Sequence, residues 1–329
     1  MRIGVPKELL QLAPVGGHGK VWHRVLAELG GTETLIALPT GRWRRRPDVV
    51  LTSGHDDLPD TRGAPLVVQV HEAGWFAPEL RGTLDPAFLA HIAPRTEHAV
   101  KSATAVITPS RAAATDLAAA YGLPAGRVHP VAHGVDPVFS PGRPGGPELV
   151  GAGVPYVLYA ATLHPRKNLP AVREAMRRLT AEGFPHVLAV AGHPAPDRAD
   201  SSGLEAGVAG ERAVRIAQTS DEQLAALMAG AAAVCLPSLY EGFGLTALEA
   251  LACGAPLVVS GRGALPEVVG DAAVVVEPTV DGATDGLRRV LAEPGLAVRL
   301  RVAGPARARG FSWERTAAGW LAVLRSAGA

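Results

Sequence analysis

The chain has 329 residues and a formal net charge of +1; hydrophobic residues make up 47% of it and charged residues 19%. This composition supports folded cores and excludes a disordered chain, and the near-neutral charge argues against nucleic acid as a partner. The length predicts two domains. The sequence has no apolar run of about 18 residues and no signal-peptide core at its start, so we expect no transmembrane segment and a cytoplasmic location. The two cysteines, Cys235 and Cys253, are expected to be reduced core residues.

Short apolar runs alternate with longer amphipathic segments in the first half of the chain. The runs that predict strands are Ile3–Pro6, Thr34–Leu38, Val49–Leu51, Leu66–Val70, Ala105–Thr108 and Val128–Ala132. The segments that predict helices are Gly19–Leu29, Phe88–Lys101 and Ala112–Tyr121, with Ser110 as a cap for the last. Strands that alternate with helices and are apolar throughout favour a parallel, doubly wound sheet.

The alternation stops at the Pro/Gly-rich run 139–147, which we interpret as a linker, and then starts again. The second set of predicted strands is Tyr156–Ala160, Val187–Ala191, Val214–Ala217, Ala232–Leu236, Leu257–Val259 and Ala273–Val276. The second set of predicted helices is Leu169–Glu182, Asp221–Met228, Leu245–Ala252 and Gly282–Leu291, and Ser312 caps a final helix. The pattern predicts two Rossmann-like α/β domains, 1–145 and 146–310, with helix 311–329 packing back towards the first. Ligands of such sheets bind beyond the carboxyl ends of strands, so we expect the site in an interdomain cleft.

The segment Pro237–Ala250 carries the strongest chemical signal. An apolar strand ends there, a glycine-bearing turn follows, and a helix begins. Backbone N–H groups at such a helix start favour a phosphate. Glu241 lies in the turn and Glu249 lies two helical turns on, a rise of roughly 12 Å that suits two carboxylates at opposite ends of an elongated ligand. The alternative is a plain strand–turn–helix with solvent carboxylates.

The segment Tyr156–Leu169 places two cations, Arg166 and Lys167, in a loop between a strand and a helix. Adjacent cations there can neutralise a diphosphate leaving group. Lys167 is one of only four lysines in the chain, which slightly favours a functional role over a solvated basic loop.

These two segments closely resemble glycosyltransferase family 4, which has the GT-B fold. The resemblance covers most of the chain and is densest from Tyr156 to Val276. It implies that Glu241 contacts the donor sugar, that Glu249 binds the nucleotide ribose, and that Arg166 and Lys167 bind the diphosphate. It also implies a donor-binding stretch made of Gly242, Phe243, Gly244, Leu245 and Thr246. Many relatives have proline at the position of Thr246.

The first half resembles the family more weakly. Gly16 and Gly17 lie in a glycine-rich segment that the resemblance places near the donor phosphate and the acceptor, and the alternative is a flexible turn before a helix. His71 ends the predicted strand Leu66–Val70, and the resemblance implies that it approaches the donor sugar. Taken alone, such a histidine is more often a core residue. Residues 42–46 form a basic cluster, which favours a solvated loop over contact with an acidic acceptor or a membrane surface.

The resemblance implies a retaining, metal-independent hexosyltransferase that needs no cofactor. We expect a nucleotide-sugar donor, with GDP-mannose first and UDP-sugars as the main competitor. The sequence does not identify the acceptor, and a glycan, a lipid-linked sugar and a small molecule are the candidates. It does not decide whether the protein contacts a membrane surface. The alternatives are a non-catalytic GT-B scaffold, a Rossmann-type oxidoreductase, or an epimerase or phosphorylase on the same fold. The chain lacks a G-x-G-x-x-G turn followed by an acidic residue, which argues against the oxidoreductase.

Overall fold

The computed structural model describes residues 1–38, 46–72, 74–77, 80, 82–151, 153–193, 212–216 and 219–329. Residues 42–45 of the basic cluster lie outside these ranges. The chain divides into two compact units: unit 1 is Met1–Gly134 with Phe311–Ala329, and unit 2 is Val135–Gly310. Unit 2 therefore begins before the predicted boundary at residue 145. The Pro/Gly-rich run belongs to unit 2 because it packs there: Phe139 is buried, and a Cβ at Gly146 would meet the carbonyl of Ala226.

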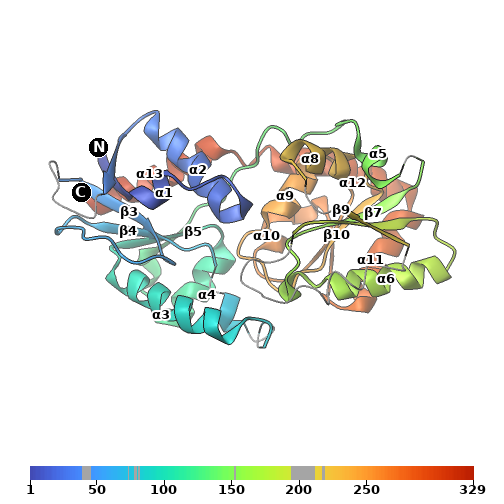
Figure 1. Ribbon diagram of the computed structural model, residues 1–329, viewed down its shortest axis with the longest axis horizontal. Helices are drawn as coiled ribbons and strands as arrows, with labels where there is room; N and C mark the ends of the chain where they lie inside the picture. The colour runs from blue at the N-terminus through green and yellow to red at the C-terminus, as the bar shows by residue number, and fades with distance from the viewer. Residues whose placement is uncertain are drawn as a thin grey trace. The chain divides into compact units, whose positions relative to one another are not determined.

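Unit 1 contains a six-stranded parallel sheet in the order β2-β1-β3-β4-β5-β6. The strands are β1 (Arg2–Pro6), β2 (Thr34–Leu38), β3 (Val49–Ser53), β4 (Leu66–Gln69), β5 (Ala105–Thr108) and β6 (Val128–Pro130). Helices α2 (Gly16–Gly30) and α13 (Trp313–Gly328) cover one face, and α3 (Pro86–Ser102) and α4 (Arg111–Tyr121) cover the other (Figure 1). The predicted doubly wound arrangement is confirmed for this unit.

The last helix completes the core of unit 1. Trp22 of α2 and Trp320 of α13 are both fully buried and meet edge to face with ring centroids 5.3 Å apart. The Ser312 hydroxyl accepts a hydrogen bond from the Arg315 amide, so the predicted cap of this helix is confirmed. Helix α13 is thus held to the sheet of unit 1 by a large apolar contact, although it follows unit 2 in sequence.

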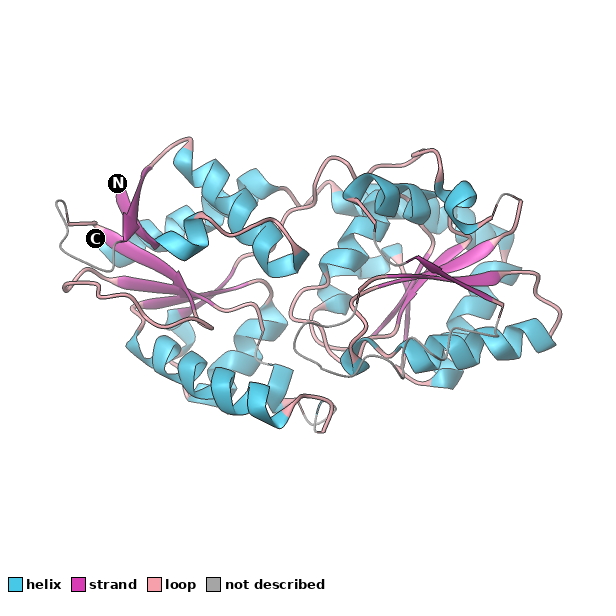
Figure 2. Ribbon diagram, in the orientation of Figure 1, coloured by secondary structure: helices cyan, strands magenta, loops and turns pink. Residues whose placement is uncertain are grey.

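Unit 2 contains a second six-stranded parallel sheet, in the order β12-β11-β10-β7-β8-β9 (Figure 2). Its strands are β7 (Tyr156–Ala160), β8 (Val187–Ala191), β9 (Ala213–Ile216), β10 (Ala233–Leu236), β11 (Leu257–Ser260) and β12 (Val274–Val276). This is the Rossmann order, in which the chain reverses direction across the sheet between the first and fourth strands. That switch point lies between β7 and β10, so ligands are expected where these two strands end.

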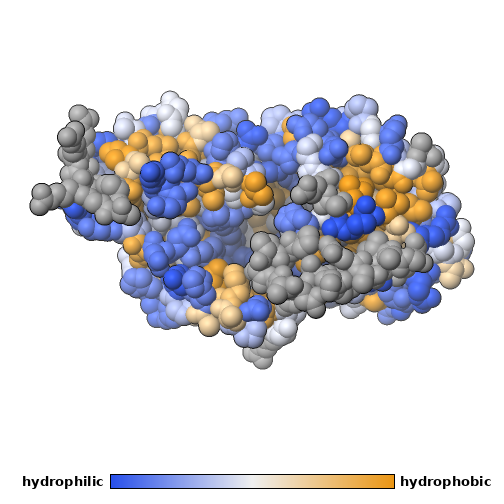
Figure 3. All heavy atoms as spheres, in the orientation of Figure 1, coloured by the Kyte–Doolittle hydropathy of each residue, from blue (hydrophilic) through white to orange (hydrophobic). Residues whose placement is uncertain are grey.

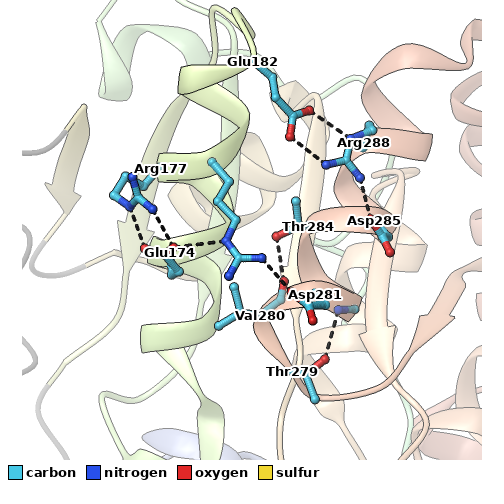
Figure 4. A network of polar contacts seen from close by, with 11 residues as sticks. Glu174, Arg177, Glu182, Thr279, Val280, Asp281, Thr284, Asp285 and Arg288 are labelled. Carbon is cyan, nitrogen blue, oxygen red and sulfur yellow. Dashed lines mark hydrogen bonds and ion pairs between the residues drawn. The ribbon is translucent and has the colours of Figure 1, made fainter.

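Helices α6 (Leu169–Ala181) and α11 (Val280–Ala292) cover one face of this sheet and are joined by ion pairs (Figure 4). Arg178 contacts Asp281 at 2.6 Å, and Arg288 contacts Glu182 at 2.7 Å. Exposed pairs of this kind contribute about 0–1 kcal/mol each, so the buried apolar faces of the helices supply most of the stability. Because α6 begins at Leu169, two residues after Lys167, its packing fixes the position of the cationic loop.

The other face of the unit 2 sheet is covered by α8 (Asp221–Gly230), α9 (Leu245–Ala252) and α12 (Pro294–Ala308) (Figure 1). The remaining short elements are α1 (Lys7–Leu10), η1 (Gly74–Phe76), η3 (Ala125–Arg127), α5 (Gly146–Val150), η4 (Pro165–Lys167), α10 (Leu265–Val269) and η5 (Gly270–Ala272). On the face shown in Figure 3, hydrophilic residues gather over α3, which carries the exposed pair Glu97–Lys101. In the part of the chain that the structure describes, every helix is too short or too polar to cross a membrane.

Candidate active site

The candidate site of unit 2 lies at the switch point of its sheet. Strand β7 ends at Ala160 and leads into the loop that carries Arg166 and Lys167. Strand β10 ends at Leu236 and leads into the turn that carries Glu241. Both loops leave the carboxyl edge of the sheet from neighbouring strands. The topology therefore brings together two segments that are more than 70 residues apart in sequence.

The Glu241 carboxylate is the centre of this site, and it is only 12% exposed. Lys167 Nζ lies 2.5 Å from its Oε1, and an Arg166 guanidinium nitrogen lies 3.3 Å from its Oε2. The Ser238 hydroxyl donates a third hydrogen bond to Oε1 at 2.8 Å. We call Arg166, Lys167, Ser238 and Glu241 the Glu241 cluster.

The charges in this cluster keep Glu241 ionised. Burial raises the pKa of its carboxyl, but Lys167 and Arg166, with the hydrogen bonds from Lys167 and Ser238, lower the pKa to about 2. A carboxyl that has already lost its proton at neutral pH cannot act as a general acid there. The cluster can instead offer two cations to an incoming anion.

Hydrogen bonds to backbone carbonyls hold the two loops of the cluster together. The Leu239 amide donates to the Arg166 carbonyl at 2.7 Å, and the Arg166 guanidinium donates to the Tyr240 carbonyl at 3.2 Å. The Asn168 side-chain amide donates to the carbonyls of Pro237 at 3.1 Å and Pro278 at 3.0 Å. These bonds set the spacing of the charged side chains.

Asn168 and Ser238 were part of the sequence motifs, but their positioning roles were not predicted. Asn168 has a φ of 58°, a left-handed conformation that asparagine adopts more readily than most residues. That conformation directs its side chain between the ends of two strands. An asparagine directly before a helix, after two cations, was the available signal for this role.

The turn after Glu241 fits closely against a neighbouring loop. A Cβ at Gly263 would collide with the Glu241 carbonyl, so this position, with a φ of 56°, requires glycine. The Ala264 amide donates to the same Glu241 carbonyl at 2.9 Å, and the Ser260 hydroxyl donates to the Ser238 carbonyl at 2.5 Å. The backbone of the cluster is thus anchored by the loop that follows β11.

The predicted donor-binding stretch forms the start of α9. Gly244 is the N-cap with a φ of 98°, and Leu245 and Thr246 lie in the first turn. Gly242 and Phe243 precede them and are buried. The N-terminal end of a helix carries a partial positive charge, which favours an anionic group near Gly244.

Glu249 lies farther along α9. Its side chain is buried and only 6% exposed. The structure therefore places Glu249 on the helix that the predicted phosphate-binding turn begins. Because α9 starts only at Leu245, Glu249 lies about one turn into the helix, and the two helical turns expected between Glu241 and Glu249 are not formed. Its contact with a ribose stays a prediction.

In unit 1 the predicted site residues lie around a group of histidines. His71 lies two residues after the end of β4, and its ring centroid lies 4.6 Å from that of His18 and 5.6 Å from that of His133. His71 Nε2 is buried and has no hydrogen-bond partner among the described residues. Burial, followed by the repulsion of neighbouring histidines, lowers the pKa of His71 well below its usual range. The imidazole is therefore neutral at pH 7.

The glycine-rich segment differs from the expected loop. Helix α2 already begins at Gly16, so Gly16 and Gly17 form its first turn rather than a turn before a helix at Gly19. A Cβ at residue 19 would collide with the Ala13 carbonyl, so the chain can fold this tightly only because this residue is glycine. His18, in the same first turn, brings this helix start into contact with His71.

Two Rossmann-like units, one of them with a cationic cluster at its switch point, define a GT-B-type protein. The chain matches the family model "Glycosyl transferases group 1" over residues 147–307 and the model "Glycosyltransferase Family 4" over residues 37–139. It is 30% identical over 291 residues to D-inositol 3-phosphate glycosyltransferase 1 of Catenulispora acidiphila, covering 81% of this chain and 68% of that protein. The chain belongs to glycosyltransferase family 4.

Further similarities extend this assignment. A segment of 113 residues, 33% of this chain and 28% of the relative, is 50% identical to the MMP α-(1→4)-mannosyltransferase of Mycolicibacterium hassiacum. The fold matches sucrose-phosphate synthase of Thermosynechococcus elongatus with a TM-score of 0.77 at 20% identity, covering 99% of this chain and 98% of that one. The chain spans less than half of the length of several curated relatives that it matches.

Proposed function

We propose that the chain is a retaining glycosyltransferase that moves a hexosyl group from a nucleotide-sugar donor to an acceptor hydroxyl. The observation that carries the proposal is the Glu241 cluster, in which two cations meet one carboxylate at the switch point of the unit 2 sheet. A nucleoside diphosphate needs cations of this kind when it leaves a sugar, because negative charge develops on its oxygens. The N-terminal end of α9 adds the partial positive charge of the helix dipole.

The reaction we propose proceeds on one face of the sugar. The bond between the anomeric carbon and the diphosphate oxygen breaks, and the acceptor oxygen forms a bond to the same carbon on the same face. The acceptor proton passes to an oxygen of the departing diphosphate. Arg166 and Lys167 hold the charge of this leaving group, so positioning and electrostatics supply most of the rate enhancement and no metal ion is required.

GDP-mannose is the donor we propose. The support is the Arg166-Lys167-Asn168 motif, which resembles that of the mannosyltransferase-like members of the family, and the strong similarity of one segment to a protein named a mannosyltransferase. With a UDP-sugar donor the same cluster and the same reaction would serve, and only the contacts to the base and sugar would differ.

A thermal-denaturation panel tests the proposal. A ligand that binds the native state raises the melting temperature by mass action. The panel contains GDP, UDP, ADP and dTDP, their common sugars, and NAD. We expect GDP and GDP-mannose to raise the melting temperature. If UDP alone raised the melting temperature, the proposed donor would change from GDP-mannose to a UDP-sugar. If no sugar nucleotide raised the melting temperature, the result would favour the non-catalytic scaffold.

A further inference from the structure

Tyr159 lies on β7, the strand that leads into the loop carrying Arg166 and Lys167, and it takes no part in the reaction proposed above. It is the fourth residue of β7, its side chain is fully buried, and its ring packs in the core with Leu163 and Leu169. Its hydroxyl has no hydrogen-bond partner among the described residues. Folded proteins rarely leave a buried hydroxyl unpaired, because the desolvation of the group is then uncompensated.

The surroundings of this hydroxyl indicate which partner it lacks. Strand pairing sets Tyr159 beside Cys235 of β10, at the edge where both strands end. The charges that act on the hydroxyl are those of Glu241 and Arg166. Burial raises the pKa of Tyr159 above its usual range, and the Glu241 carboxylate raises it further, while Arg166 opposes them. The phenol therefore keeps its proton and can donate it to an acceptor such as this carboxylate.

In the structure, the Glu241 carboxylate already accepts three hydrogen bonds. Lys167, Arg166 and Ser238 all donate to it. A bound diphosphate would compete for the two cations, because its oxygens carry more charge than one carboxylate. The buried carboxylate would then keep the Ser238 bond and need a new donor.

We propose that Tyr159 is a positioning residue of the donor site, whose hydroxyl donates to the Glu241 carboxylate when a diphosphate draws Lys167 and Arg166 away. The inference rests on the proposed function, since it requires a diphosphate at this cluster. In this account the Tyr159 hydroxyl has no partner among the described residues as long as both cations contact the Glu241 carboxylate. It keeps Glu241 oriented towards the sugar once the cations have turned to the leaving group.

The variant Tyr159→Phe separates this role from a purely structural one. Tyr156→Phe is the matched control, because Tyr156 is also buried on β7 but already donates to the Leu227 carbonyl at 2.7 Å. Calorimetry of the ligand-free proteins gives the melting temperature of each variant. We expect Tyr159→Phe to melt at or above the wild-type temperature, and Tyr156→Phe to melt below it.

Titration then measures the affinity for whichever of GDP, UDP, ADP or dTDP stabilises the wild type. We expect Tyr159→Phe to bind that nucleotide about tenfold more weakly, as a lost hydrogen bond to a charged group predicts, and Tyr156→Phe to bind it with wild-type affinity. A conservative Tyr159→Phe variant with wild-type affinity would overturn the inference and leave the proposed function intact. So would a loss of melting temperature in ligand-free Tyr159→Phe equal to that of Tyr156→Phe. A wild-type protein that binds none of the four nucleotides would overturn both.

Discussion

Lys167 Nζ lies 2.5 Å from Glu241 Oε1, although the two residues are 74 positions apart in the chain. Both side chains are mostly buried, with 16% and 12% of their surfaces exposed. Removal of one partner from a buried pair leaves the other charge uncompensated, so both residues matter for the folded state. In the structure the carboxylate pairs with the two cations that the proposed diphosphate would need.

Lys167→Ala is expected to lower the transfer rate by about 10²–10³-fold, the usual cost of removing one group that stabilises a developing oxyanion. Lys101→Ala is the control, because Lys101 forms only an exposed pair with Glu97 on α3. Steady-state kinetics with the donor that binds would measure both. Near-normal turnover of Lys167→Ala would contradict the role assigned to this lysine.

Glu249→Ala is expected to weaken nucleotide binding about tenfold, since a charged hydrogen bond to the ribose would be lost. The control is Glu293→Ala, which removes an exposed carboxylate between α11 and α12 of the same unit. Calorimetric titration with the nucleoside diphosphate measures the effect. Equal affinities for wild type and Glu249→Ala would count against the ribose contact.

Asn168→Gly is expected to destabilise unit 2 by about 1–3 kcal/mol, because the carbonyls of Pro237 and Pro278 would lose a donor. Glycine keeps the left-handed backbone available. Asn168→Ala loses the same bonds and adds roughly 1 kcal/mol of strain at a φ of 58°. Urea unfolding followed by circular dichroism would rank the three proteins. If Asn168→Ala were as stable as Asn168→Gly, the left-handed backbone at residue 168 would impose no strain on alanine, contrary to this prediction.

Unit 1 is expected to lose stability as the pH falls below 6.5. Burial lowers the pKa of His133 to about 3 and that of His55 to about 4, so the unfolded chain takes up protons at these sites before the folded chain does. The free energy of unfolding that the two neutral histidines contribute is fully present above pH 6.5. It is lost as the pH falls towards the folded-state pKa values of about 4 and about 3.

Tryptophan fluorescence can follow this effect in unit 1 alone, because all five tryptophans lie in residues 1–134 and 311–329. His133→Asn should flatten the pH dependence of the urea midpoint between pH 6.5 and about 5, where few carboxyls titrate. The exposed His23→Gln is the control. An unchanged slope in His133→Asn would show that this histidine is not responsible.

EDTA is expected to leave transfer activity unchanged, because Arg166 and Lys167 supply the positive charge that a metal ion supplies elsewhere. Activity with and without EDTA, and after the addition of Mg²⁺, measures this. Loss of activity that Mg²⁺ restores would contradict the metal-independent reaction.

The strands could be predicted because each has a strong local signal, whereas the contact of Glu241 with Arg166 and Lys167 joins two segments that the sequence presented separately. Strand Tyr156–Ala160 is apolar throughout and bounded by turn residues, and the structure has the same bounds. The predicted caps Ser110 and Ser312 were confirmed for the same reason. Helix α12 was not predicted. It contains Pro294 at its first position, where proline is tolerated, and Pro305 in its last turn.

The positioning side chains could not be predicted, because they depend on contacts between distant segments. The apolar pattern of β7 predicts that Tyr159 is buried, but not that its hydroxyl lacks a partner. In the same way, Asn168 reaches Pro278 across 110 positions of the chain, which no local pattern encodes.

The central claim is that Arg166 and Lys167 bind the diphosphate of a sugar nucleotide, and calorimetric titration tests it most directly. Wild type and Lys167→Ala would each be titrated with GDP, UDP and the corresponding nucleosides. The account predicts that one diphosphate binds the wild type, that Lys167→Ala weakens it at least tenfold, and that the nucleoside binds both proteins equally weakly. A diphosphate that binds wild type and Lys167→Ala with the same affinity would contradict the account.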